Sequence, residues 1–513
     1  MTKKGNAAAV IEIGADQVRM RVSQLSKGAV ATLDYLEYPI PLGHDVYETG
    51  SVSFDSLREL SGILEKFTRA LKTYRIQKPK VISCTALRDA KNRVFVVDQL
   101  RVRNELDVTL LEESQEKAYL YSEITAGLNS IDALKDGNSV IVHVGAGSIG
   151  VALYDGNKIT CFQNISTGAL KLQDVLEGIH NARDDFHLMM EEYLDTLLNH
   201  VFLPDVPVSN LILTGLEIDL MAKLCGAKRV ENGYLLGAKR LTELYGALRT
   251  LSPENIGMRY GITEQQAAVL FTSLSIYQST LRFCPSAEMI YAPMVDISQA
   301  LLRCMLSSKA ETERIASFQK NAIACAETTA RRFGCDLKHS QKLRKDCCLI
   351  FDRLKRVHGL DSSKRLILEL AAILHSCGSF VSVRQRTRCT FDLIKGLDLF
   401  GLKESDVFAV AYTAGAIAGN LGHDEPELLS LSAKERLSLS KLTAIFRMAN
   451  ALDKSHRQKL KELKITVEDD RVQFKAKASV DTLLEQWAFS EAAKVFQEVF
   501  GLSPELSIKF DLL

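Results

Sequence analysis

The chain has 513 residues, 46% of them hydrophobic and 25% charged, and a formal net charge of +1. This is the composition of an ordinary globular protein, and the length is too great for one hydrophobic core, so we expect about three or four packing units. The near-neutral charge excludes a general polyanion binder and gives no reason to expect specific nucleic-acid binding, so any bound phosphate must be held by a local cluster.

Two further features of the composition bear on location. No apolar run approaches the ~20 residues that a membrane span needs, and the apolar stretch that begins at Ala7 is interrupted by Glu12, unlike a signal peptide. The eleven cysteines form no CxxC pair, which is typical of reduced, mostly buried thiols. We therefore expect a cytoplasmic protein with no contact to a membrane.

Two segments early in the chain share one pattern. Residues 7–25 form an apolar strand, a turn that contains glycine and an alternating strand, and residues 139–162 repeat this plan. In the second segment Asp155 and Gly156 turn the next hairpin. A unit used twice, about 130 residues apart, predicts an internal duplication into two α/β halves that face each other.

The pattern changes to helices from about Ala310. Apolar residues recur at spacings of three and four up to about Arg457, and several helical stretches end at a glycine. The last residues predict a hairpin at 464–478, an amphipathic helix with Trp487 on its apolar face, and a final strand at 505–510. This part of the chain is therefore expected to be all-α, followed by a small α/β unit.

The run from Gly145 to Gly150, GAGSIG, matches the dinucleotide-binding pattern GxGxxG. That pattern needs a helix directly after it, whereas here the chain continues as an alternating strand. A glycine-rich turn between antiparallel strands can instead bring backbone N–H groups onto a phosphate, as in actin-like folds. A plain hairpin turn is the alternative, but three glycines and a serine exceed what it needs. The loop therefore predicts phosphate binding.

Seven segments resemble, in order and spacing, the motifs of the exopolyphosphatase and guanosine pentaphosphate phosphatase family. The two family loops that read DIGSNS and DIGGGSTE correspond here to EIGADQ and HVGAGSIG. No single motif is decisive, and it is their order over nearly the whole chain that carries the resemblance. The segments are residues 12–17, 85–92, 112–121, 143–150, 164–172, 371–378 and 446–455.

The resemblance implies a fold and an activity. The fold is a duplicated actin/hexokinase-like (ribonuclease H-like) α/β fold, then an HD-like helical domain and a small C-terminal α/β unit. The implied boundaries are 1–127, 128–305, 306–457 and 458–513. The activity is hydrolysis of a terminal phosphoanhydride in inorganic polyphosphate or in guanosine penta- or tetraphosphate. A divalent metal ion, Mg²⁺ or Mn²⁺, and a homodimer are implied as well.

The resemblance also assigns roles to single residues. Glu116 is the implied general base, which takes a proton from the attacking water, and Arg88 is an implied phosphate ligand. From the residues alone, the favoured interpretation of Glu116 is a solvated helix carboxylate, and the alternative for Arg88 is an exposed helix-start residue paired with Asp89. The remaining implied phosphate-binding residues are Gly14, Gly145, Gly147, Ser148 and Gly168.

The metal site departs from the family pattern. Glu12 replaces the aspartate of the first loop, His143 the aspartate of the second, and Gly150 its closing glutamate. Mg²⁺ prefers carboxylate oxygen to imidazole, so Glu12 and His143 are weak candidate ligands. A working hydrolase and a binding or sensing protein both stay open. A kinase that uses ATP is disfavoured, because the segment 213–217 lacks the paired glycines of an adenosine pocket.

The helical block departs as well. His375 is followed by Ser376, and Arg386 and Arg388 stand where the family has histidines. We expect His375 to be a buried core histidine and this block to hold no catalytic metal. The alternating arginines that begin at Arg384 predict either a channel for a polyanion or a solvated basic turn.

Overall fold

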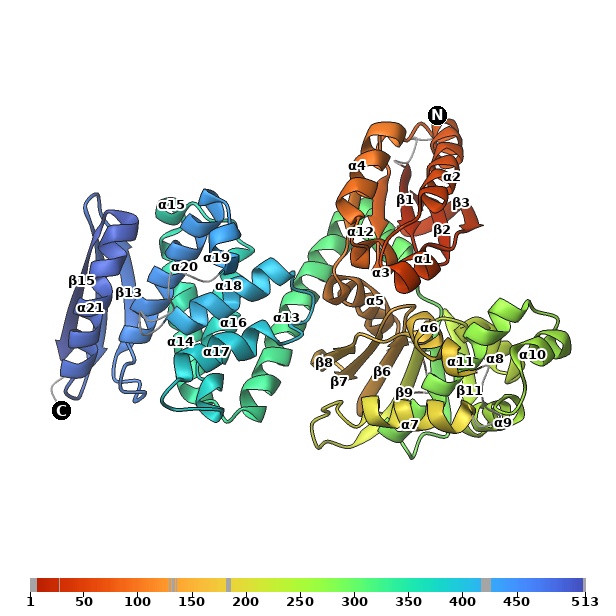
Figure 1. Ribbon diagram of the computed structural model, residues 1–513. Helices are drawn as coiled ribbons and strands as arrows, with labels where there is room; N and C mark the ends of the chain where they lie inside the picture. Colours follow the sequence, from red (N-terminus) through yellow and green to blue (C-terminus); the bar gives the residue numbers. More distant parts are fainter. Residues whose placement is uncertain are drawn as a thin grey trace. The chain divides into compact units, whose positions relative to one another are not determined.

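A computed structural model describes residues 7–26, 28–128, 131, 134, 136–180, 186–416 and 426–510. The chain divides into two compact units, Met1–Asn321 and Ala322–Leu513, and both are drawn in Figure 1. The division falls within helix α13 (Ser308–Arg332). No helix in the described ranges is long and apolar enough to cross a bilayer.

The first half of unit 1 is built on a five-stranded sheet of order β3-β2-β1-β4-β5. Strand β1 lies at its centre, antiparallel to β2 and parallel to β4. Its inner residues Val10 and Ile11 are fully buried, as expected for a strand that is covered on both faces. The strands are β1 (Ala7–Ile13), β2 (Gln17–Ser26), β3 (Ala29–Pro39), β4 (Lys80–Ser83) and β5 (Val108–Leu110).

The second half of unit 1 carries a seven-stranded sheet of order β10-β11-β12-β9-β6-β7-β8. Its β8-β7-β6-β9-β12 portion repeats the order of the first sheet, which confirms the predicted duplication. The strands are β6 (Asn138–Val144), β7 (Ile149–Tyr154), β8 (Ile159–Ile165), β9 (Val208–Gly215), β10 (Lys228–Val230), β11 (Gly233–Gly237) and β12 (Met289–Pro293).

Helices cover both sheets of unit 1 (Figure 1), and α3, α5, α6 and α12 contribute to the site described below. The helices are α1 (Leu42–Thr49), α2 (Phe54–Thr73), α3 (Thr85–Asp89), α4 (Arg93–Asn104), α5 (Glu113–Leu128), α6 (Ala169–His180), α7 (Phe186–Leu198), α8 (Ile218–Leu224), α9 (Ala238–Leu248), α10 (Pro253–Tyr260), α11 (Glu264–Thr280), η1 (Leu281–Phe283) and α12 (Ile297–Leu306).

Unit 2 begins with a helical bundle. Helix α20 starts at a capping box, in which the Ser432 side chain accepts from the Glu435 amide and the Glu435 carboxylate accepts from the Ser432 amide. The helices are α14 (Leu337–Arg353), α15 (Lys355–His358), α16 (Lys364–Leu374), η2 (Cys377–Phe380), α17 (Arg386–Lys395), α18 (Glu404–Gly415), α19 (Pro426–Ser430) and α20 (Ala433–Ala451).

The chain ends in a three-stranded sheet of order β13-β14-β15. The hairpin of β13 (Lys461–Val467) and β14 (Arg471–Ala478) is confirmed, and β15 (Ser503–Phe510) runs parallel to β14 after helix α21 (Leu483–Phe500). One expectation is wrong: Trp487 is 59% exposed. The buried face of α21 carries Phe489 and Phe496, and Trp487, two residues before Phe489, projects to the opposite side because successive helical residues turn by about 100°.

The finer predicted division, with boundaries at 127, 305 and 457, remains a prediction. The observed division places the end of the first unit at Asn321.

Candidate phosphate-binding site

The glycine-rich loop joins β6 to β7 and is closed by a hydrogen bond from the Gly145 amide to the Ser148 carbonyl, 2.8 Å long. The backbone of Gly168 packs directly on this loop. A Cβ atom at Gly168 would lie 2.3 Å from the Gly145 carbonyl oxygen and 2.3 Å from the Ser148 amide. Glycine is therefore required at position 168 by the close approach of two backbones.

The first amides of α6 also bind this loop. The Ala169 amide donates to the Gly145 carbonyl at 2.9 Å, and the Leu170 and Lys171 amides both donate to the Ala146 carbonyl, at 3.0 and 3.1 Å. These N–H groups are the ones that a helix leaves without an intrahelical partner. Here they hold the loop in place and so fix its conformation.

The loop lies against the first half of unit 1. A Cβ atom at Gly147 would be 2.2 Å from Cγ2 of Thr85 and 3.0 Å from the hydroxyl of Tyr47. Thr85 is the first residue of α3, the short helix that carries Arg88. The predicted loop therefore packs against the short helix that carries the predicted arginine.

Arg88 and Glu116 form the ion pair at this place. Nη1 of Arg88 lies 3.8 Å from Oε2 of Glu116 and donates to the Leu111 carbonyl at 3.0 Å, while Nε lies 3.3 Å from Oδ1 of Asp89. The two paired side chains are 18% and 14% exposed. Burial lowers the pKa of Arg88, but the carboxylates of Glu116 and Asp89 outweigh it and raise the pKa above its usual value.

The carboxylate of Glu12, on β1, already has a hydrogen-bond partner and an ion-pair partner. Its Oε2 accepts from the Ser298 hydroxyl at 2.9 Å, and its Oε1 lies 3.8 Å from Nη1 of Arg19. Burial raises the pKa of Glu12, Arg19 opposes that shift, and the carboxylate of Asp296 adds to it.

The first loop, at Gly14, is also closed by the backbone. The Gly14 amide donates to the Gln17 carbonyl at 2.9 Å, and a Cβ atom at Gly14 would lie 2.8 Å from that oxygen. The phosphate-binding roles assigned to the glycines and to Ser148, which is buried, remain predictions.

Lys117 is a member of the site that the sequence analysis missed. It is 1% exposed, and its Nζ lies 3.5 Å from the position that a Cβ atom at Gly145 would take. Burial lowers its pKa, and the carboxylates of Glu116 and Glu113 oppose that shift. A signal was present in the sequence, because Lys117 falls on the same face of α5 as the buried positions 120, 121, 124 and 128.

His143 lies beside this lysine. It is 8% exposed, and its Nε2 lies 3.8 Å from the same Cβ position at Gly145. Its Nδ1 is buried and has no hydrogen-bond partner among the residues that the structure describes. Burial, and then the charge of Lys117, lower the pKa of His143 well below its usual range, so the imidazole is neutral.

Residues 323–492 match the family model described as Ppx/GppA phosphatase, domain III. This part of the chain is therefore similar to the third domain of that family. An exopolyphosphatase structure from Cytophaga hutchinsonii is 18% identical, with 59% of this chain and 98% of that one covered and a TM-score of 0.51. A Ppx/GppA structure from Aquifex aeolicus is also 18% identical, with the same coverage and a TM-score of 0.49. The first likeness agrees with the predicted fold class, an actin-like α/β fold followed by a helical domain.

The Ppx/GppA resemblance implied a divalent metal, and the residues present do not fit Mg²⁺. The predicted ligands are a neutral imidazole, His143, and a carboxylate, Glu12, that already binds Ser298. The ammonium of Lys117 lies next to that imidazole and repels a dication. In the ranges that the structure describes, no group of three His, Cys, Asp or Glu residues could hold a metal ion. We derive no step that involves a metal.

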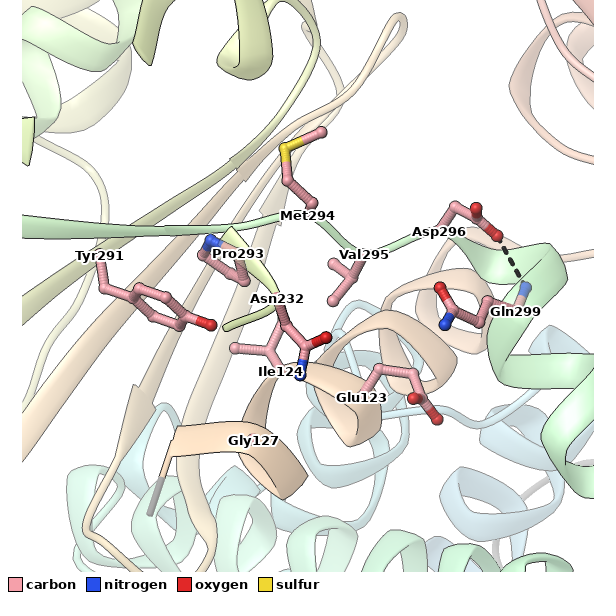
Figure 2. A pocket seen from close by; sticks show the side chains of 10 residues that line it. All are labelled: Glu123, Ile124, Gly127, Asn232, Tyr291, Pro293, Met294, Val295, Asp296 and Gln299. Carbon is pink, nitrogen blue, oxygen red and sulfur yellow. Dashed lines mark hydrogen bonds between the residues drawn. The ribbon is translucent and has the colours of Figure 1, made fainter. Parts of the chain in front are cut away.

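A pocket of about 100 Å³ lies beside this site in unit 1. Figure 2 shows its lining, with the Gln299 amide donating to the Asp296 carboxylate at 2.7 Å. None of the predicted site residues lines it. Helix α12 links the pocket to the candidate site. Its Ser298 donates a hydrogen bond to Glu12, and the residues on either side of this serine in the pocket lining are Asp296 and Gln299.

In unit 2, His375 is buried as expected, but it is not isolated. Its Nδ1 lies 2.9 Å from the Ala372 carbonyl, its ring centre lies 5.1 Å from that of His339, and His339 stacks on His456 at 3.6 Å. Burial, helped by the neighbouring histidines, lowers the pKa of His375 to about 3. The sequence analysis missed this cluster because its members are distant in the sequence.

The arginines that begin at Arg384 favour the interpretation as a solvated basic turn over a channel for a polyanion. Arg384, Arg386 and Arg388 are exposed, and Nε of Arg388 binds Asp392 at 2.8 Å, one turn further along α17. The expectation that this part of the chain holds no catalytic metal remains a prediction.

Proposed function

We propose that unit 1 hydrolyses the terminal phosphoanhydride of inorganic polyphosphate or of guanosine penta- or tetraphosphate. The observation that carries this proposal is the pair of Arg88 and Glu116, 3.8 Å apart, with Arg88 on the short helix whose first residue, Thr85, meets the loop at Gly147. A carboxylate and a guanidinium at one phosphate site supply the two things that the reaction needs, a proton acceptor and a positive charge.

Glu116 acts as the general base. It takes a proton from a water molecule while the oxygen of that water forms a bond to the terminal phosphorus, and the anhydride P–O bond breaks. The products are inorganic phosphate and a chain shortened by one phosphate. Arg88 compensates the charge on the phosphoryl oxygens, for which its planar fork of N–H donors is suited.

Phosphate release tests this proposal directly. The full chain is incubated with tripolyphosphate, long-chain polyphosphate or guanosine pentaphosphate, with no ATP present. We expect release from at least one of the three, at a rate within the usual range for enzymes, roughly 1–10³ per second. No release from any of them, with each divalent metal and without metal, would contradict hydrolysis.

A binding or sensing function without turnover is the second candidate. The observation that favours it is the neutral His143 beside a buried lysine, at the position where the family has a metal-binding aspartate. Calorimetric binding of polyphosphate in the absence of phosphate release would identify this function.

The other implied properties are also proposals. Sedimentation of the purified chain tests the homodimer, and fractionation of cells tests the cytoplasmic location. Comparison of polyphosphate with guanosine pentaphosphate in the release assay decides between the two substrate classes.

A further inference from the structure

The ammonium of Lys117 is buried without a counter-ion. The side chain is 1% exposed, and in the described ranges no hydrogen bond or ion pair to its Nζ is present. Glu116 and Glu113 are close enough to favour its charged form, but Glu116 is paired with Arg88. A buried charge without a direct ion-pair partner is costly, and an anion bound at Nζ would offset that cost.

The missing anion has a defined place. Nζ of Lys117 and Nε2 of His143 lie 3.5 and 3.8 Å from one point, the position of a Cβ atom at Gly145. That point is at the start of the glycine-rich loop, and His143 has a second ring nitrogen, Nδ1, that is buried without a partner. Two polar side chains, each more than nine-tenths buried, therefore converge on the loop that the sequence predicts to bind phosphate.

The lysine also occupies the space that a second carboxylate would need. A Cβ atom at Gly150 would lie 3.2 Å from Cε of Lys117 and 2.6 Å from the hydroxyl of Tyr121. The stem of Lys117 thus runs past Gly150 and ends beside Gly145. A divalent cation at this end of the loop would face the ammonium group of Lys117, which repels it.

We propose that the ammonium of Lys117 is the cation that binds the terminal phosphoryl group, in place of a divalent metal. The inference rests on the proposed function, because it assumes that a phosphate chain enters this loop. A lysine ammonium binds phosphate as a point charge with three donors and stabilises the charge on a phosphoryl group as a metal ion does. Unit 1 therefore binds phosphate chains without a metal.

Calorimetry with tripolyphosphate on the full chain tests this inference. The wild type is titrated in EDTA and again in Mg²⁺, and Lys117→Met is titrated in EDTA. Methionine removes the charge and keeps the length of the side chain. Lys80→Met is the matched control, because Lys80 is a partly buried lysine of the same unit whose Nζ donates to the Thr109 hydroxyl at 2.9 Å.

We expect the wild type and Lys80→Met to bind tripolyphosphate equally well in EDTA. Lys117→Met should bind it roughly 10- to 100-fold more weakly, which is the loss typical of one hydrogen bond to a charged group. Binding by the wild type only when Mg²⁺ is added would overturn the inference. So would unchanged binding by a folded Lys117→Met, because the lysine would then be structural. The wild-type titration decides the question even if the variant does not fold. Absence of binding in both buffers would instead reject the proposed function itself.

Discussion

His143 and Gly150 are direct partners across the antiparallel strands β6 and β7. Partners in such a pair point to the same face of the sheet, and on this face α5 places Lys117 and Tyr121 against them. Two of the three positions at which the chain departs from the family metal site, His143 and Gly150, are therefore one structural site, which Lys117 occupies.

We predict that restoring both carboxylates, as His143→Asp with Gly150→Glu, does not create Mg²⁺-dependent phosphate release. A glutamate at position 150 collides with Tyr121 and Lys117, and an aspartate at position 143 pairs with the lysine ammonium instead of a metal ion. The measurement is phosphate release with and without Mg²⁺, together with the melting temperature.

Adding Lys117→Ala to this double variant is the control, because it removes the competing cation and opens space. The triple variant is expected to gain a response to Mg²⁺. A gain in the double variant alone would show that the lysine does not block the site.

Gly168→Ala is expected to lower the free energy of unfolding of unit 1 by about 1–3 kcal/mol. The added methyl group meets the Gly145 carbonyl and the Ser148 amide at 2.3 Å, so one of two backbones must move. Gly62→Ala on α2 is the matched control, since nothing lies within 4 Å of its added carbon, and there alanine should stabilise by about 0.5–1 kcal/mol. Urea unfolding of both variants checks the prediction. Equal effects would mean that position 168 is not constrained.

The histidine cluster predicts a pH dependence in unit 2. The pKa of His375 is lowered from 6.5 to about 3 in the folded state, so between these values the unfolded chain binds the extra proton. The stabilisation is complete above pH 6.5 and is lost as the pH falls toward 3, by at most about 1.4 kcal/mol per pH unit for this group. Hydrogen exchange of the α16 amides at pH 7 and 5 measures it.

His375→Gln is the comparison for this experiment. The glutamine variant should lose less stability than the wild type over the same pH range, because one titrating group is gone. Identical losses in the two proteins would assign the pH dependence to other groups.

Much of the fold could be predicted from patterns within short segments of the sequence. The repeated strand–turn–strand unit predicted two related sheets because hydrophobic alternation and glycine turns are properties of short segments, and the shared strand order bears this out. Spacings of three and four predicted the helices of unit 2 for the same reason. Trp487 was placed wrongly because α21 carries apolar residues on more than one face, and burial there depends on Phe489 and Phe496 meeting the sheet.

The site was harder to predict because it depends on tertiary contacts. Glu116 could be assigned by its place in a motif, but the lysine next to it looks like any charged helix residue until the loop at Gly145 is placed beside it. His339, His375 and His456 come from different segments, and only their packing makes them a cluster.

The most direct test of the account is Glu116→Gln, with Glu59→Gln, an exposed carboxylate on α2, as the matched control. Phosphate release and tripolyphosphate binding are measured on wild type and both variants. The account predicts that Glu116→Gln lowers release by roughly 10²–10⁴-fold, the usual cost of removing a general base, while binding and the control variant stay near wild type. A Glu116→Gln variant that releases phosphate within about threefold of the wild type, far below that cost, would contradict the assignment of Glu116 as the base.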